Sequence, residues 1–294
     1  MSAVHEARVG LPVVSARRKA TDRVARGLIA AMTLITVVPL VLVVYFLIAR
    51  GAGAWTAEFF TTDPTGSVLG DPGGMRSAYL GTLVIVALAA LISIPVGIGI
   101  GVYLVDYGRR SRFAGIVRYF VDVMTGVPSI VFGLFVYIVL VVSHVGGSAS
   151  AAWKGSIALA LLMMPVVARS SEVVLSLVPD SLREAALALG TPRWRVVMRI
   201  VLPTALPGLI TGSLLAIARG AGETAPLLFT VSITNGTSFD LNNLMDSLPM
   251  QVFGNIGSPN PALVERGWGA ALLLVTMVLV ATAIARLAAR RSRL

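Results

Sequence analysis

The sequence of 294 residues contains no cysteine, only two histidines and only two lysines. Without cysteine the chain has no disulfide, no cysteine-ligated zinc site and no thiol nucleophile. His5 and His144 lie far apart in a tail and a loop, so we expect neither a metal site nor a catalytic histidine. Neither Lys19 nor Lys154 stands in the GxxxxGK[ST] pattern of a P-loop, so the chain cannot bind ATP by that route. We therefore expect no catalytic residue, no metal and no directly bound cofactor.

Charged residues are also scarce, because Asp, Glu, Lys and Arg make up 13% of the chain while apolar residues make up 56%. Soluble globular domains carry roughly 25% charged residues, and a surface facing water cannot be built from half that amount. An ordinary soluble enzyme, a disordered chain and a fibrous repeat are thereby excluded. The composition predicts an all-α polytopic membrane protein.

A bilayer core about 30 Å thick needs about 20 apolar residues of helix. Five charge-free stretches are long enough: 27–49, 77–105, 123–153, 200–218 and 267–285. A further span over about 153–177 is interrupted by Arg169 and Glu172, and the span from residue 200 is expected to continue to about Thr230. The sequence therefore predicts six transmembrane helices in one domain, 26–289, between a basic tail, 1–25, and a basic end, 290–294.

Two glycine patterns mark helix interiors. Gly97 and Gly101 form a small-xxx-small pair that favours close packing of the second span against a neighbouring helix. Gly126 and Pro128, in the segment TGVPSIVFG, are expected to kink or break the third span.

The distribution of cations predicts the orientation. Of the 24 lysines and arginines, 18 lie in the tail, the basic end and the alternate loops that share one side of the membrane. The positive-inside rule places that side, and both termini, in the cytoplasm, with an uncleaved first helix. The net charge of +10 therefore reports topology beside anionic lipid, and we expect no nucleic acid partner.

The loop 181–203 is expected to be ordered. Ser181 and Glu184 fit a capping box, Gly190 fits a helix stop, and Thr191 with Pro192 fits the start of a second short helix ending at Pro203. Two short helices joined at a glycine, on the cytoplasmic side, suit the docking of another protein.

The spacing within this loop resembles the EAA loop of ABC importer permeases. The matching positions are Glu184, Ala185, Ala186, Gly190, Ile200, Leu202 and Pro203. The resemblance implies that the loop is a coupling helix seated in a cleft of a separate ATPase subunit, which binds ATP and magnesium.

A narrower resemblance, over about residues 79–288, is to the PstA-type permeases of phosphate-specific importers. It is carried by 126–135, 166–197 and 216–230, the last with the continuation ETAPLLF. It implies a phosphate permease in a bacterial inner membrane. Its implied partners are a PstC-type permease, two PstB-type ATPases and a PstS-type phosphate-binding protein on the outer face.

Two arginines interrupt the apolar spans, each followed by a carboxylate. Arg169 and Glu172 are three residues apart, and Arg219 and Glu223 are four apart, so each pair shares a helix face. A charge at the bilayer centre costs about 2.5–3.5 kcal/mol, which a neighbouring carboxylate offsets. The pairs can simply orient two helices, or the arginines can face a cavity and bind an oxyanion in competition with the carboxylates. The resemblance points to the second interpretation for both arginines.

Asp122, near the cytoplasmic end of the third span, is interpreted as an interfacial structural group. Two other functions remain open at this point: an ABC permease for another oxyanion such as sulfate or molybdate, and a gradient-driven carrier or channel.

Overall fold

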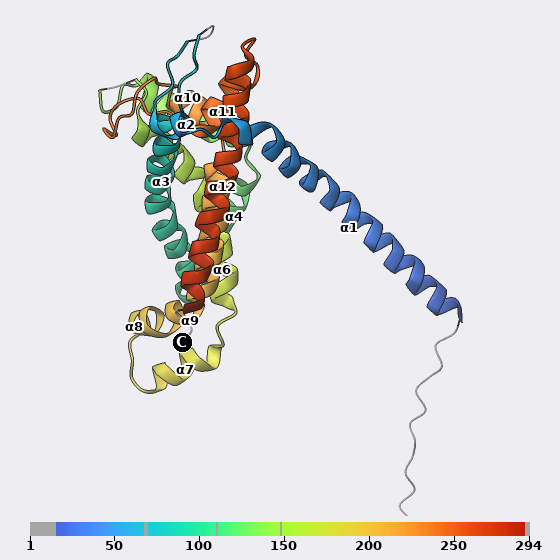
Figure 1. Ribbon diagram of the computed structural model, residues 1–294. Helices are drawn as coiled ribbons and strands as arrows, with labels where there is room; N and C mark the ends of the chain where they lie inside the picture. The colour runs from blue at the N-terminus through green and yellow to red at the C-terminus, as the bar shows by residue number, and fades with distance from the viewer. Residues whose placement is uncertain (1–15, 68–69, 110, 148, 292–294) are drawn as a thin grey trace, which may run out of the picture. The chain divides into compact units, whose positions relative to one another are not determined.

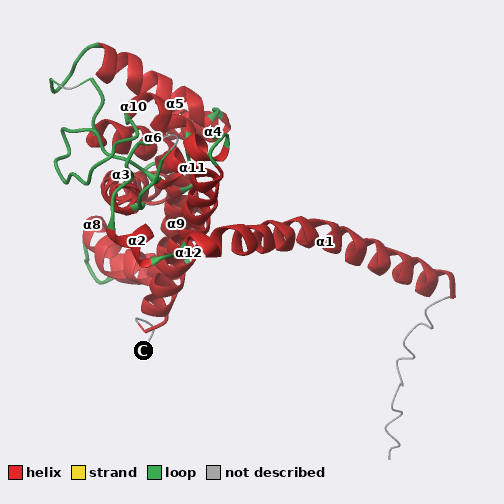
Figure 2. Cartoon of the chain, turned by 45° about the horizontal axis from the view of Figure 1, so that its top comes forward, coloured by secondary structure: helices red, strands yellow, loops and turns green. Residues whose placement is uncertain are grey.

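The computed structural model describes residues 16–67, 70–109, 111–147 and 149–291. These residues form helices and loops, with one isolated β-bridge between Pro64 and Gly73 and no strand within the described ranges (Figure 2). Most of the predicted tail and residues 292–294 of the predicted basic end lie outside the described residues.

The chain divides into two units, residues 1–48 and 49–294. Helix α1 (Ala16–Gly51) makes up the described part of the first unit and continues three residues into the second. Its apolar side chains are exposed, for example Leu34 at 63% and Ile35 at 71%, as a helix surrounded by lipid requires.

The second unit contains the other helices. In chain order they are η1 (Ala52–Ala54), α2 (Ala57–Thr61), α3 (Arg76–Val102), η2 (Tyr103–Tyr107), α4 (Arg112–Gly126), α5 (Ser129–Val136), η3 (Tyr137–Val142), α6 (Ala152–Ser176), α7 (Asp180–Ala188), α8 (Arg193–Val196), η4 (Val197–Val201), α9 (Leu202–Ala221), α10 (Ala225–Thr230), α11 (Leu248–Ile256) and α12 (Pro261–Arg291). Within this unit α2, α10 and α11 lie at one end of the long helices and α7 and α8 at the other (Figure 1). We call these the α11 end and the α7 end.

Five helices of the described chain are long and apolar enough to cross a membrane, and there are six such spans if one bent pair of helices is counted as a single broken span. The bend of 103° separates α4 from α5 and η3. It lies at Val127, whose backbone is extended (φ −71°, ψ 131°) because the ring of Pro128 disfavours helical geometry in the residue before it. The predicted break at Gly126–Pro128 is confirmed, and the six predicted spans agree with the count in which the bent pair is one span.

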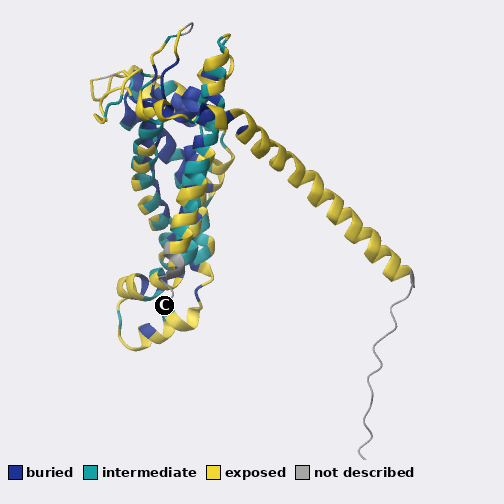
Figure 3. Ribbon diagram, in the orientation of Figure 1, coloured by how far each residue is buried: buried dark blue, intermediate teal, exposed yellow. Residues whose placement is uncertain are grey.

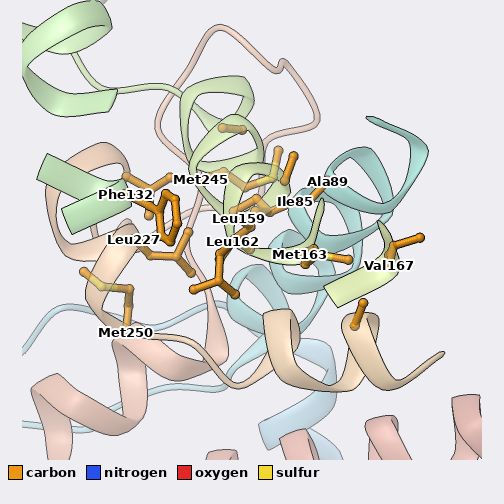
Figure 4. Close-up of a cluster of buried hydrophobic side chains, with 14 residues drawn as sticks. Ile85, Ala89, Phe132, Leu159, Leu162, Met163, Val167, Leu227, Met245 and Met250 are labelled. Atoms are coloured by element: carbon orange, nitrogen blue, oxygen red, sulfur yellow. The ribbon is translucent and has the colours of Figure 1, made fainter. Parts of the chain in front are cut away.

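Helix α6 is the central element, with half of its span buried inside the chain. Its residues Leu159, Met163 and Val167 belong to the largest apolar cluster, beside Ile85 and Ala89 of α3 (Figure 4). Buried residues are densest at the α11 end and along the centre of the unit (Figure 3).

Glycines bring α3 and α9 close to α6. A Cβ at Gly97 would lie 2.6 Å from that of Val167, and one at Gly101 would lie 2.7 Å from that of Ser171, so the predicted packing role of this pair is confirmed. Gly99, between them, faces open space. On α9, Gly212 meets Ser170 and Gly220 meets Met163, which sets an antiparallel register between α9 and α6.

The fifth span is shorter than predicted. Helix α9 ends at Ala221, and α10 is a separate helix that begins at Ala225. Gly220 and Gly222 weaken the helix here and Pro226 lacks the N–H that would continue it. Glu223 therefore lies in the connection between two helices, and the expectation that it shares a helix with Arg219 is wrong.

The predicted coupling loop is ordered, with its boundaries changed. Helix α7 begins at Asp180, its N-cap is Pro179, and no side chain caps it, so the capping box at Ser181 is wrong. Gly190 confirms the predicted stop: its φ is +77°, its N–H donates to Leu187 O, and Thr191 N–H donates to Ala186 O.

The second helix of the loop begins at Arg193, one residue later than predicted, and does not end at Pro203. It continues through the π-helical turn η4 into α9 as one apolar helix, Arg193–Ala221. A proline ring clashes with the carbonyl four residues before it, and the wider π turn lies at that position. The loop is therefore continuous with a membrane span.

A partly exposed ion pair at the α11 end joins Asp63 to Arg76, the first residue of α3. Arg76 donates from Nε and Nη2 to the two carboxylate oxygens of Asp63, at 3.1 and 2.8 Å. The N–H and hydroxyl of Thr237 donate to the same carboxylate, at 3.1 and 2.6 Å. The hydrogen bond from Arg76 is the largest cause that lowers the pKa of Asp63 to about 2.

The pKa of a second carboxyl at this end, that of Asp246, is shifted in the opposite direction. Its residue is 1% exposed, and its carboxylate accepts from Gln251 Nε2 at 2.6 Å and from the N–H of Ser247 at 2.7 Å. Burial disfavours the charged form more than these hydrogen bonds favour it, which raises the pKa of Asp246 to about 7.

From these two pKa shifts we predict that the stability of the chain rises with pH in the acid range and falls with pH toward neutrality. The contribution of Asp63 is complete above its ordinary pKa of 3.8 and is lost as pH falls through about 2. That of Asp246 is complete below 3.8 and is lost as pH rises through about 7. The measurement is the thermal unfolding temperature of the purified chain in detergent at a series of pH values. Asp63→Asn should remove the dependence on pH in the acid range, and Asp246→Asn should remove the dependence on pH toward neutrality. Profiles parallel to wild type in both variants would contradict this assignment.

Candidate functional site

The first intramembrane pair lies on α6. Arg169 Nη1 donates to Glu172 Oε2 at 2.6 Å, which confirms the pairing predicted from their spacing. Glu172 is 12% exposed, whereas Arg169 is 45% exposed. The carboxylate is therefore buried in the chain while the guanidinium reaches its surface.

Helix α4 adds two more charges to this pair. Arg118 Nε donates to the other oxygen of Glu172 at 2.7 Å, and Asp122 Oδ1 lies 3.4 Å from Arg169 Nη2. We call Arg118, Asp122, Arg169 and Glu172 the α4–α6 charge cluster. Two cations and two anions make it neutral, with Glu172 between the two guanidiniums.

Sequence reasoning missed half of this cluster. Arg118 is one of the 18 cations that the sequence assigns to the loops and tails of one side, with no partner predicted. Asp122, expected at the interface, is 49% exposed but is also an ion-pair partner of Arg169. The available signal was their spacing, because residues four apart on a helix share a face. What the spacing could not show is that this face lies against Glu172.

The cluster leaves donors available. A guanidinium carries five N–H groups. In the described chain Arg118 and Arg169 each use one of theirs in a hydrogen bond, both to Glu172. With exposed fractions of 43% and 45%, both arginines can also reach an anion that approaches from outside this chain.

The second pair is looser. Arg219 Nε lies 3.7 Å from Glu223 Oε1, which is an ion pair but is longer than a hydrogen bond. Arg219 is 46% exposed and Glu223 is 21% exposed. The predicted pairing is confirmed, although Glu223 reaches Arg219 from the α9–α10 connection.

The two arginines lie at different levels of the helix pair. Since Ser170 faces Gly212, Arg169 is level with Ser213, and Arg219 is six residues farther toward the α11 end. Six residues of α-helix correspond to about 9 Å. This separation along the helix axis means that the structure presents two separate cationic levels.

The coupling-loop residues divide between an inner and an outer face. Ala186 is buried, in an apolar cluster with Leu175, Val178 and Val201, whereas Glu184 and Ala185 are exposed. Gly190 and Pro203 are exposed, and Ile200 and Leu202 are half-buried. The inner face therefore anchors the loop, and the outer face is free to contact another molecule.

The outer face also carries apolar side chains, with Leu189 at 86% exposed and Trp194 at 58%. A cavity of about 460 Å³ beside it is lined by Arg109, Asp180, Glu184 and Arg193, among others. Exposed apolar groups rimmed by charges are typical of a protein interaction surface.

Comparison with known proteins gives consistent results. The sequence model of the family described as "Binding-protein-dependent transport system inner membrane component" matches residues 93–294. The phosphate transport system permease protein PstA of Pasteurella multocida is 40% identical over 247 residues, covering 83% of this chain and 86% of that protein. The protein of the same name from Mycobacterium leprae is 41% identical over 273 residues, covering 92% and 89%.

Solved structures agree on the fold. An inward-facing MetNI methionine ABC transporter chain matches with a TM-score of 0.59 at 20% identity, covering 72% of this chain and 93% of that one. A chain of a bacterial ABC transporter that imports the acidic polysaccharide alginate matches with a TM-score of 0.59 at 15% identity, covering 93% and 99%.

The two intramembrane carboxylates predict different effects on stability. Glu172→Gln leaves two guanidiniums without their shared counter-charge and should lower the free energy of unfolding by about 1–3 kcal/mol. Glu223→Gln removes one long, partly exposed pair and should cost less than about 1 kcal/mol. Denaturant unfolding in detergent measures both, and a larger loss for Glu223→Gln would contradict the geometry.

Proposed function

We propose that this chain, which belongs to the family of binding-protein-dependent transport system inner membrane components, is the phosphate permease subunit of an ATP-driven ABC importer. The observation that carries the proposal is the identity of about 40% to phosphate permeases over most of the chain. The ordered EAA loop and the arginines within the spans supply the physical basis.

The energy comes from a separate subunit in this proposal. The sequence has no P-loop, and the outer face of α7 offers Glu184 and Leu189 to a partner. Two PstB-type ATPases bind ATP and magnesium, and one of them receives the loop of this chain in a cleft. A PstC-type permease completes the membrane part, and a PstS-type protein delivers phosphate at the outer face.

The α7 end faces the cytoplasm of a bacterial cell in this account. The cationic loops gather there, with Arg109, Arg183 and Arg193 around α7 and α8. The C-terminal end of α12 lies at the same end (Figure 1), which supports a cytoplasmic C-terminus, and six spans then place the N-terminus on that side too.

The substrate passes the two cationic levels in turn. Phosphate released at the α11 end first meets Arg219 and then reaches Arg169 and Arg118, about 9 Å nearer the cytoplasm. Guanidinium binds phosphate oxygens bidentately, and Glu172 and Glu223 compete for the same donors. That competition keeps binding moderate and permits release.

The loop can drive this passage directly. Because α8, η4 and α9 are one continuous helix, a displacement at Arg193 moves the span that carries Arg219. Closure of the ATPase dimer on ATP then shifts the loop 181–203, and the helices change from inward-facing to outward-facing.

A permease for another oxyanion is the nearest alternative. Arsenate shares the tetrahedral shape and charge of phosphate, so it should compete with phosphate uptake, whereas molybdate should not. If molybdate competes and arsenate does not, phosphate is rejected as the substrate in favour of another oxyanion.

Arg219→Gln tests the substrate pathway. The variant should abolish phosphate uptake, a fall of at least about tenfold, because a hydrogen bond to a charged group contributes roughly 1.5–3 kcal/mol. Uptake of radioactive phosphate by cells is the measurement, with complex assembly checked by co-purification. Arg112→Gln, the same change at the first residue of α4, is the control. Normal uptake in Arg219→Gln would show that Arg219 has a structural role only.

Glu184→Lys tests the docking role of the loop. Reversal of charge on the exposed face of α7 should detach or uncouple the ATPase, so that co-purification or uptake falls. Glu265→Lys, the same change at the α11 end, should leave both intact. If the Glu184 variant retains both, the proposed docking is rejected.

A further inference from the structure

The side chain of Arg183 lies inside the coupling loop, where it borders the cavity beside the docking face, and it has no part in the proposed substrate pathway. Its Nε donates to Asp106 Oδ1 at 2.9 Å, and its Nη2 donates to Leu175 O at 2.9 Å. Its Nη1 donates to Val178 O and to Asp180 Oδ1, the latter at 3.2 Å. One guanidinium therefore serves four acceptors.

These acceptors belong to different parts of the membrane domain. Asp106 lies in η2, at the end of α3, and Leu175 lies in the last turn of α6. Val178 lies in the connection from α6, and Asp180 opens α7. Arg183 thus joins the coupling helix to two membrane spans at once.

Burial makes this junction hard to open. The side chain of Arg183 is 13% exposed and that of Asp106 is 8% exposed. The second carboxylate oxygen of Asp106 is buried with no hydrogen-bond partner among the described residues. Asp106 therefore depends on Arg183 for its counter-charge, and separating α7 from α3 would leave Asp106 without it, while Arg183 would keep Asp180 of its own helix.

Apolar packing reinforces the same junction. Val105, Leu175, Val178 and Ala186 share one buried cluster that joins the ends of α3 and α6 to α7. By contrast, Arg109 and Asp180 form an ion pair at the surface, with 61% and 50% of their side chains exposed. Such exposed pairs contribute little to the rigidity of a loop.

We propose that Arg183 is a positioning residue that makes α7 and the cytoplasmic ends of α3 and α6 move as one body, so that motion of the docked ATPase reaches both spans. The proposal rests on the proposed function in one respect, namely that α7 docks the ATPase. It extends the coupling element from the EAA loop to the Asp106–Arg183 pair.

The absence of native cysteine allows a direct test. Tyr107→Cys in η2 and Leu189→Cys after α7 replace residues that are 48% and 86% exposed. Spin labels on this pair, in the complete complex in nanodiscs, report the distance from α3 to α7. With Arg183 present we expect one narrow distance distribution that stays the same with and without ATP.

Arg183→Gln should broaden that distribution and make it depend on ATP. Arg109→Gln, an equal charge change at the exposed ion pair with Asp180, should leave it narrow and is the matched control. Arg183→Lys keeps the charge but not the planar fork, so its distribution should lie between the two. Wild-type width in Arg183→Gln would overturn the proposal. If the complex with Arg183→Gln does not assemble, Asp106→Asn provides the same test, because it removes the charge of the partner and preserves its size.

A functional readout separates coupling from mere folding. In proteoliposomes, Arg183→Gln should lower the phosphate transported per ATP hydrolysed by roughly 2- to 30-fold, the range by which mutations along a coupling network change coupling. The ATPase should still co-purify, because the docking face of α7 is unchanged. An unchanged ratio in an assembled Arg183→Gln complex would contradict the positioning role.

The two proposals can fail separately. If the wild-type complex hydrolyses ATP but imports no phosphate, the proposed substrate is wrong, and the label distances still decide the role of Arg183. If phosphate is imported and the distances are insensitive to Arg183→Gln, the proposed function stands and this inference falls.

Discussion

The architecture depends on one constraint: a charge inside the membrane must have an opposite charge or water beside it. Glu172 meets that constraint for α6 by pairing with Arg169 of its own helix and Arg118 of α4, at 2.6 and 2.7 Å. The carboxylate is buried while both guanidiniums reach the surface of the chain. The same arrangement that makes the charges tolerable also presents donors to an oxyanion, so structural and substrate-binding roles of the cluster do not exclude each other.

The central position of α6 connects this cluster to the coupling loop. Glycines bring α3 and α9 close to it, so its neighbours cannot shift without disturbing close backbone contacts. At its α7 end, Arg183 donates to the carbonyl of Leu175 and, just beyond the helix, to that of Val178. The ionic groups thus occur at two places along α6, one beside α4 and one beside α7, with close packing between them.

Local patterns in the sequence predicted much of this structure. Five charge-free runs and one run interrupted by Arg169 and Glu172 predicted the spans. Gly126, Pro128 and Gly190 act through backbone preferences that do not depend on distant residues. Ser181 and the end of α9 were predicted wrongly, because a proline preceding α7 and another in α10 set those boundaries. The contact of Arg118 with Glu172 joins residues 54 positions apart, and no spacing rule reaches that far.

The central claim is that ATP, and not an ion gradient, drives phosphate through this chain. The most direct measurement is phosphate uptake into proteoliposomes that contain the chain with its permease partner, its ATPases and its phosphate-binding protein. The account predicts uptake that requires ATP and the ATPase subunits and continues when an ionophore collapses the proton gradient. Uptake that persists without the ATPase and stops when the gradient collapses would contradict it.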